Sequence, residues 1–144
     1  MQDYNRIGAW INVLERNIEH AGNSMLKDSG ITVMQLRVLK YLKAHPEESQ
    51  IADISEFFDV THPSMIHVVN VLEHKGYVYR EPIRRSRGKK ILLTDSGRQL
   101  ADENENRIDS LEAVLTEGFS EEDKAQLLKM LKRINSNLDS HFER

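Results

Sequence analysis

A cluster of cations between two predicted strands carries the clearest chemical signal in this sequence. The chain has a formal net charge of −3, so a concentrated positive loop stands out against an acidic background and fits a polyanionic partner. For a charge run alone, a solvated hairpin tip is the competing interpretation. The cations are Arg84, Arg85, Arg87, Lys89 and Lys90.

The segment that precedes this loop supports the polyanion interpretation. On a helical wheel of about 100° per residue, residues 60–75 form an amphipathic helix whose apolar side contains Met65, Val68, Val69 and Leu72. The opposite side mixes polar and apolar residues and must meet a partner. The partner-facing candidates are Pro63, Ile66, His67 and Asn70, together with His62 and Ser64 in the first turn.

Local signals define both ends of this helix and the hairpin that follows. Thr61 can cap the start, Pro63 is tolerated in the first turn, and Gly76 supplies a left-handed stop. The β-type runs at 77–80 and 90–93 flank the cationic loop. The sequence therefore predicts a helix followed by a two-stranded wing.

Composition indicates one globular domain of ordinary size. The chain has 144 residues, of which 39% are hydrophobic and 30% charged, which fits neither a disordered nor a membrane-embedded chain. No apolar run approaches the roughly 20 residues that span a bilayer, and the first residues lack a signal peptide's apolar stretch. We therefore expect a cytoplasmic protein. The absence of cysteine excludes disulfides, thiolate nucleophiles and thiol redox sensors.

Long amphipathic helices are predicted near both ends of the chain. Apolar residues recur at three- and four-residue spacing between Ile7 and Met25 and again between Leu127 and Phe142. Stripes of this length exceed what a small winged core can cover, so we expect them to form a dimer interface. The dimerisation candidates are Ile7, Trp10, Ile11, Leu14, Ile18, Leu127, Leu131, Ile134, Leu138 and Phe142.

Two short helices are predicted ahead of the helix at 60–75. Thr32 and Gln35 form a capping box for the first, and Ser49 is expected to cap the second. Asp59 stands where the chain must turn, because aspartate tolerates the left-handed conformation. The helix expected after Ser49 and the helix at 60–75 are thus joined by a tight turn, and the second of them has an exposed face of mixed polarity. This arrangement predicts a helix-turn-helix.

Beyond the wing, the sequence predicts one long helix and then a C-terminal helix. Thr94 caps the long helix, which ends at Gly118, and Ser120 with Asp123 caps the last one. Residues 95–144 hold 12 acidic residues against 7 basic ones, so we do not expect this half to touch a polyanion.

The histidines do not indicate catalysis or metal binding. None of the six lies in an HExxH pattern or in a tight group with carboxylates, and the chain has no glycine-rich phosphate loop. A zinc site would need inward histidine and carboxylate ligands at suitable spacing. We therefore expect no enzymatic activity, no cofactor and no bound metal.

Several short motifs occur in a characteristic order along nearly the whole chain. They are Ile31-Thr32, Gln35, Val38-Leu39, the segment Leu72–Val78, the arginine-bearing wing, and Leu93-Thr94 with Gly97. Each motif is weak alone. In this order and spacing they resemble the MarR (multiple-antibiotic-resistance regulator) family of winged-helix transcriptional regulators.

This resemblance implies a sequence-specific regulator, which we expect to be a repressor, that binds double-stranded DNA as a homodimer on a pseudo-palindromic operator. In such a dimer the terminal helices interleave and the two wings straddle the DNA. A small aromatic or anionic effector commonly releases the DNA in this family. By resemblance, the effector cleft is expected between the N-terminal helix and the helix that starts at Thr32.

The chain departs from the family pattern in the recognition helix and in the wing. Ile66 and His67 stand where the family often has serine followed by arginine, so no guanidinium reads guanine there. Ile66 can instead touch a thymine methyl group. Arg85 replaces the wing's usual aspartate, whereas Arg87 keeps the wing arginine. The missing carboxylate removes an ion pair and leaves a more positive tip.

The expected fold is mainly α with a small β-hairpin wing. It comprises an N-terminal dimerisation helix at 1–30, a winged helix-turn-helix DNA-binding domain at 31–94 and C-terminal dimerisation helices at 95–144. The main rival function is a winged-helix module for protein contact, because no lysine or arginine lies between Thr61 and His74. The basic wing favours DNA, since phosphate contacts predict steep salt dependence, whereas a protein groove prefers apolar anchors.

Overall fold

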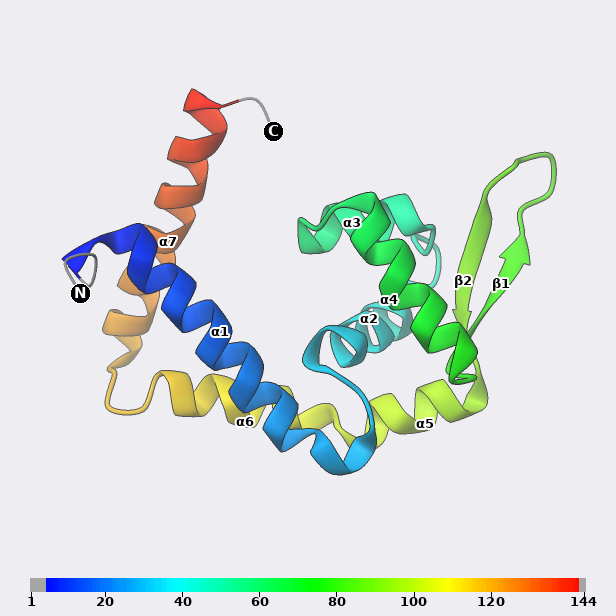
Figure 1. The fold of residues 1–144 in the computed structure, drawn as a ribbon, viewed down its shortest axis with the longest axis horizontal. Coiled ribbons are helices and arrows are strands. Elements are labelled where there is room, and N and C mark those ends of the chain that lie inside the picture. Colours follow the sequence, from blue (N-terminus) through cyan, green and yellow to red (C-terminus); the bar gives the residue numbers. More distant parts are fainter. Residues whose placement is uncertain (1–4, 143–144) are drawn as a thin grey trace. The chain divides into compact units, whose positions relative to one another are not determined.

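The computed structural model describes residues 5–142, which are mainly helical with one β-hairpin (Figure 1), and this confirms the predicted fold class. The helices are α1 (Ile7–Met25), α2 (Val33–Ala44), α3 (Ile51–Phe58), α4 (His62–His74), α5 (Asp95–Glu103), α6 (Glu105–Leu115) and α7 (Glu121–His141). The strands are β1 (Val78–Pro82) and β2 (Lys89–Leu93), and a short 3-10 helix, η2, spans Lys27–Ser29. The chain divides into two compact units between Asp109 and Ser110.

Helix α2 forms the centre of the core of the first unit. Its Leu36, Val38 and Leu39 side chains are fully buried, and it packs against α4, α5 and β2. The predicted capping box starts this helix, because Thr32 Oγ1 accepts from Gln35 N at 3.2 Å and Gln35 Oε1 accepts from Thr32 N at 3.1 Å. Buried side chains of the other elements complete the core. They include Ile54, Met65, Val69, Leu72, Val78, Ile91 and Ala101.

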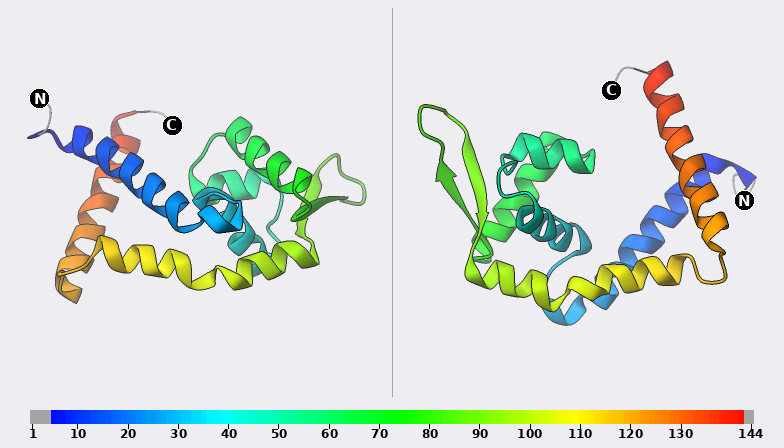
Figure 2. Two further views of the ribbon diagram at one scale, coloured as in Figure 1. Left: turned by 60° about the horizontal axis from the view of Figure 1, so that its bottom comes forward. Right: turned by 180° about the vertical axis from the view of Figure 1, so that it is seen from behind.

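The two strands form an antiparallel hairpin that extends from its base beside α5 (Figure 2). Val78 pairs with Leu93 at the base, and Pro82 pairs with Lys89 near the tip. Val78 and Ile91 are buried in the common core, whereas the residues toward the tip are mostly exposed. The hairpin is therefore anchored at one end and open to solvent at the other.

The prediction of one long helix after Thr94 is wrong in one respect. The segment forms two helices, α5 and α6, which are separated at Asn104. This residue has φ −110° and ψ 12°, and its Nδ2 donates to the carbonyl of Leu100 at 2.8 Å. The backbone N–H of Asn104 also donates to Leu100, at 3.2 Å. An asparagine side chain that competes for helix carbonyls in this way interrupts a helix.

An ion pair connects η2, which follows α1, to α6 within the first unit. Arg107 Nη1 donates to Asp28 Oδ1 at 2.7 Å, and Nη2 donates to Oδ2 at 3.1 Å. The same guanidinium also donates to the carbonyl of Met25. The segment after α1 is thereby attached to a residue far along the sequence.

Helix α7, in the second unit, begins as predicted. Ser120 Oγ accepts from Asp123 N at 3.0 Å, and Asp123 Oδ2 accepts from Ser120 N at 3.1 Å, which forms a capping box. None of the helices in residues 5–142 has both the length and the apolar character of a bilayer span.

Candidate nucleic-acid interface

Helices α3 and α4 are joined by the tight turn that the sequence predicts. Asp59 adopts the left-handed conformation with φ 52° and ψ 44°. Thr61 Oγ1 then accepts from Ser64 N at 3.3 Å, and Pro63 lies in the first turn of α4. Gly76 follows the helix with φ 80°. These contacts confirm the helix-turn-helix and the predicted ends of its second helix.

Helix α4 has one buried face and one exposed face. The buried face consists of Met65, Val69 and Leu72. The exposed face includes the predicted contact residues His62, Pro63, Ser64, His67 and Asn70. Ile66 is half-buried, so only part of its side chain can reach a partner. The exposed face of α4 thus consists of small, polar and imidazole side chains, and the helix contains no lysine or arginine.

The tip of the wing is a tight turn closed by backbone hydrogen bonds. Ser86 N donates to the carbonyl of Ile83 at 3.1 Å, and Ile83 N donates to the carbonyl of Gly88 at 3.2 Å. Arg85 is the third residue of the first turn and has φ 64°. A positive φ at this position is usually adopted by glycine or asparagine, so the turn holds an arginine in a conformation that its Cβ disfavours.

Four cations of the wing are exposed, and within residues 5–142 their side chains make no ion pair or hydrogen bond. They are Arg84, Arg85, Arg87 and Lys89. Lys90, the next residue on β2, differs because its Nζ lies 3.6 Å from Glu47 Oε2. The positive potential at the tip is therefore not cancelled by a neighbouring carboxylate of the described chain, and it is available to an anionic partner.

A backbone hydrogen bond attaches the wing to the loop before α3. The sequence did not predict this contact. Ile91 N donates to the carbonyl of Ser49 at 2.9 Å. The prediction that Ser49 caps α3 is wrong, because Ser49 is buried beside β2 and Gln50 is the N-cap. Gln50 N donates to Asp53 Oδ2 at 3.0 Å. A Cβ on Gly88 would lie 2.5 Å from Gln50 Oε1, so the loop also abuts the far end of the wing.

A second contact that the sequence did not predict connects β1 with α4. Arg80 Nη2 donates to Asn70 Oδ1 at 2.7 Å, and Arg80 Nη1 forms an ion pair with Glu73. A helical wheel cannot reveal this contact, because Arg80 belongs to a strand. The signal that could have found it is a cation placed on the first strand after the helix, where short connections bring the two elements together.

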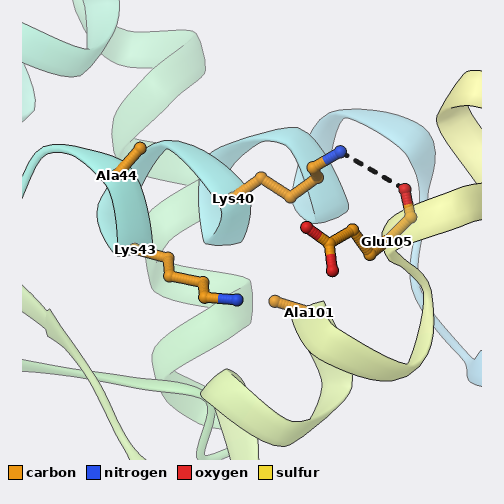
Figure 3. A pocket seen from close by; sticks show the side chains of 5 residues that line it. All are labelled: Lys40, Lys43, Ala44, Ala101 and Glu105. Carbon is orange, nitrogen blue, oxygen red and sulfur yellow. Dashed lines mark hydrogen bonds between the residues drawn. The ribbon is translucent and has the colours of Figure 1, made fainter.

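A pocket of about 290 Å³ lies between α2 and the junction of α5 and α6 (Figure 3). Its lining residues are Lys40, Lys43, Ala44, Ala101 and Glu105. Lys40 Nζ donates to the carbonyl of Glu105 at 3.4 Å, and a hydrogen bond to Asp102 raises the pKa of Lys43. None of the lining residues belongs to α1, so the effector cleft expected between α1 and α2 stays a prediction.

The described residues form no metal-ligand cluster, and they place the predicted dimerisation residues at or near the surface. In the chain from residue 5 to residue 142, no group of three or more histidine, aspartate or glutamate side chains could hold a metal ion. Of the predicted dimerisation residues, the exposed ones are Ile7, Trp10, Leu14, Leu127, Leu131, Leu138 and Phe142. The half-buried ones are Ile11, Ile18 and Ile134. Each terminal helix therefore leaves large apolar side chains in contact with solvent.

The order of the elements and the exposed groups define a structural class. Helices α2, α3 and α4 pack around one core, the turn at Asp59 joins the last two, and a hairpin with a cationic tip follows at once. This arrangement is a winged helix-turn-helix.

Comparisons with known proteins relate this winged helix-turn-helix to the MarR family. The family model described as MarR family matches residues 29–87. MepR of Staphylococcus aureus, solved as a DNA complex, is 27% identical, with a TM-score of 0.86 over 92% of this chain and 98% of MepR. A MarR mutant from E. coli in complex with operator DNA is 21% identical, with a TM-score of 0.81 over 92% and 95% of the two chains. Residues 29–87 therefore match the MarR family of winged-helix regulators, and the chain as a whole shares the fold of these structures.

A third similar structure is described together with a small molecule. Bordetella bronchiseptica BpsR, whose DNA binding is described as regulated by 6-hydroxynicotinic acid, is 15% identical, with a TM-score of 0.83 over 91% of this chain and 94% of BpsR. At this identity the similarity shows the shared fold alone.

Proposed function

We propose that this protein is a sequence-specific transcriptional repressor that binds a pseudo-palindromic DNA operator as a homodimer. The observation that carries the proposal is the set of exposed wing cations beside a recognition helix with an open polar face. Phosphate contacts from such cations supply affinity, whereas side chains on the helix read base edges. The DNA complexes of MepR and MarR support the same arrangement for this chain.

The two parts of the interface have different tasks in this proposal. The exposed face of α4 enters the major groove, where His67 and Asn70 can donate or accept hydrogen bonds and Ile66 can touch a thymine methyl group. Arg87 reaches the minor groove beside the operator half-site, because a guanidinium suits a narrow A·T-rich groove. Arg84, Arg85 and Lys89 lie nearer the phosphates.

The homodimer follows from the apolar side chains that the terminal helices leave exposed. Large exposed apolar surfaces mark interfaces in soluble proteins. We assign residues 1–30 and 95–144 to dimerisation and residues 31–94 to DNA binding. Two recognition helices held in this way would contact half-sites about one helical turn of DNA apart. A regulator that acts on chromosomal operators works in the cytoplasm.

Release of DNA by a small aromatic or anionic compound completes the proposal. Such a compound weakens DNA binding only if it prefers a dimer whose recognition helices are spaced wrongly for the operator. Couplings of this kind amount to about 1–3 kcal/mol. BpsR and its ligand provide the precedent, and the predicted site is a cleft between α1 and α2.

The decisive experiment is selection of genomic DNA fragments by the purified protein at several salt concentrations. We expect a shared inverted-repeat sequence whose affinity falls steeply as salt rises. The matched control is a triple variant, Arg84→Gln, Arg87→Gln and Lys89→Gln, which keeps the exposed face of α4 and loses the wing charge. If neither the parent nor the control enriches any shared sequence among the fragments, the DNA proposal is wrong and a role in protein contact gains support.

A further inference from the structure

Arg80 of β1 determines how the side-chain amide of Asn70 is oriented. Arg80 Nη2 lies 2.7 Å from Asn70 Oδ1. A guanidinium carries only donors, so the atom of Asn70 that faces it must be the oxygen. The chemistry of the partner thus fixes the direction of an amide whose two ends are otherwise nearly alike.

Glu73 holds the guanidinium in this position. It pairs with Arg80 Nη1 and lies three residues after Asn70, on the same side of α4. The Arg80 side chain is 21% exposed and that of Glu73 is 41% exposed, so the contact lies at the edge of the exposed helix face. Arg80 therefore bridges two residues of the recognition helix, and its charge is balanced within the protein.

This contact limits what Asn70 can read. An asparagine that recognises adenine uses its amide nitrogen and its oxygen together, the nitrogen toward N7 and the oxygen toward the N6 amino group. Here the oxygen already faces a guanidinium, so an adenine amino group would bring a second positively polarised donor to the same atom. The amide nitrogen has no hydrogen-bond partner among the described residues. Both N–H donors of Asn70 are therefore free within the described part of the chain, whereas its oxygen keeps only one further lone pair, which lies beside a guanidinium.

We propose that Arg80 is a specificity-determining residue, which makes Asn70 a hydrogen-bond donor toward acceptor atoms in the major groove. The inference rests on the proposed function, because it takes the exposed face of α4 to meet base pairs. Guanine presents N7 and O6 as acceptors and thymine presents O4, whereas cytosine presents only an amino donor. At the position that Asn70 contacts, the order of preference is guanine or thymine first, then adenine, then cytosine.

The test measures affinity for duplexes that carry each of the four bases at every position of one selected half-site. Asn70→Ala locates the contacted position, because preference there flattens while other positions keep theirs. Arg80→Met releases the oxygen of Asn70, and we expect adenine to gain about tenfold relative to guanine at that position alone. Glu73→Gln is the matched control. It removes the charge of the carboxylate but keeps an amide oxygen that can accept from Arg80 Nη1, so the guanidinium should stay beside Asn70 and the base order should stay that of the parent.

A second variant protects the test against a misfolded Arg80→Met. Asn70→Asp keeps a partner for Arg80 but turns the group toward DNA from donor to acceptor, so cytosine should become the preferred base at the same position. The inference is overturned if the parent already prefers adenine there, if Asn70→Ala flattens no position, or if Asn70→Asp keeps the parent's base order. A parent without any base preference would instead overturn the proposed function, and this inference with it.

Discussion

The backbone carbonyl of Tyr77 occupies the space that a Cβ on residue 97 would need. A Cβ placed on Gly97 would lie 2.0 Å from Tyr77 O, far inside van der Waals contact. The contact is held by Thr94, whose N–H donates to Tyr77 O at 3.1 Å and whose Oγ1 accepts from Gly97 N at 3.0 Å. The start of α5 therefore lies directly against the start of the wing.

We predict that Gly97→Ala destabilises the protein by about 1–3 kcal/mol, because the backbone of α5 or of the wing must move to admit the methyl group. Urea unfolding of parent and variant measures the difference. Gly8→Ala in α1 is the control, since a Cβ there meets nothing within 4 Å. Alanine should raise helix stability at that position by about 0.5–1 kcal/mol. Equal stability of Gly97→Ala and the parent would contradict the prediction.

The wing cations should differ in their contributions to DNA binding. Each phosphate contact contributes about 0.9 to the slope of log affinity against log salt, so Arg84→Gln and Lys89→Gln should each lower the slope by up to that amount. Arg87→Gln should cost more affinity, most of all on A·T-rich flanking DNA. Salt titrations of operator binding test this order. Lys90→Gln is the control, because Lys90 is paired with Glu47 and should change the slope least.

Arg85 allows backbone strain to be separated from charge. Arg85→Asn and Arg85→Gln both remove the cation, but asparagine tolerates the left-handed conformation better than glutamine does. We expect the asparagine variant to be more stable than the glutamine variant by on the order of 0.5–1 kcal/mol in free energy of unfolding, measured with urea. Both variants should lower the salt slope of DNA binding equally. If the glutamine variant is as stable as the asparagine one, φ 64° at this position carries no strain worth removing.

Local residue chemistry accounts for the parts of the fold that could be predicted from the sequence. Asp59 and Gly76 have positive φ, as expected, and Thr61 caps the helix between them. Each of these signals acts within four residues, so no knowledge of the tertiary structure is needed to interpret it. The buried face of α4 follows in the same way from the helical period.

The failures involve burial and contacts that local sequence signals do not show. Ser49 is a good capping residue, but β2 uses its carbonyl and α3 starts one residue later. The break at Asn104 depends on a buried side chain that binds the Leu100 carbonyl, and sequence alone cannot show that burial. In the sequence, Arg80 is one more charged residue of the first strand, and only the structure shows its hydrogen bond to Asn70. The candidate site could be located from the sequence, but its hydrogen bonding could not.

The Asp28 to Arg107 ion pair should make stability depend on pH in the acid range. Arg107 lowers the pKa of Asp28 below its ordinary value of 3.8, mainly through the hydrogen bond and then through its charge. A carboxyl group with a lowered folded-state pKa stabilises the protein above its unfolded pKa, and this contribution is lost as pH falls through the folded pKa.

The stability difference between the parent and Asp28→Asn should therefore be constant above pH 4 to 5 and shrink in more acidic solution. Urea unfolding at a series of pH values measures it. Arg133→Gln, which removes an exposed arginine of α7, changes the net charge by one in the opposite direction. A general effect of net charge would therefore appear in this control with the opposite sign, and we expect no such step. A difference between Asp28→Asn and the parent that is the same at every pH would show that the ion pair does not stabilise the folded state.

The exposed apolar side chains of the terminal helices should support a homodimer. We predict that Trp10→Glu on α1 and Leu131→Glu on α7 each shift the protein toward monomer, because a carboxylate cannot be buried in an apolar interface without a partner. Sedimentation over a range of protein concentrations measures the shift. Operator affinity should fall together with dimerisation, because a monomer binds one half-site and loses the effective concentration that links the two. Lys132→Glu introduces the same charge beside Leu131 at a polar position and should leave both properties close to those of the parent. A parent that sediments as a monomer, or a Leu131→Glu variant that dimerises as tightly as the parent, would remove these helices from the interface.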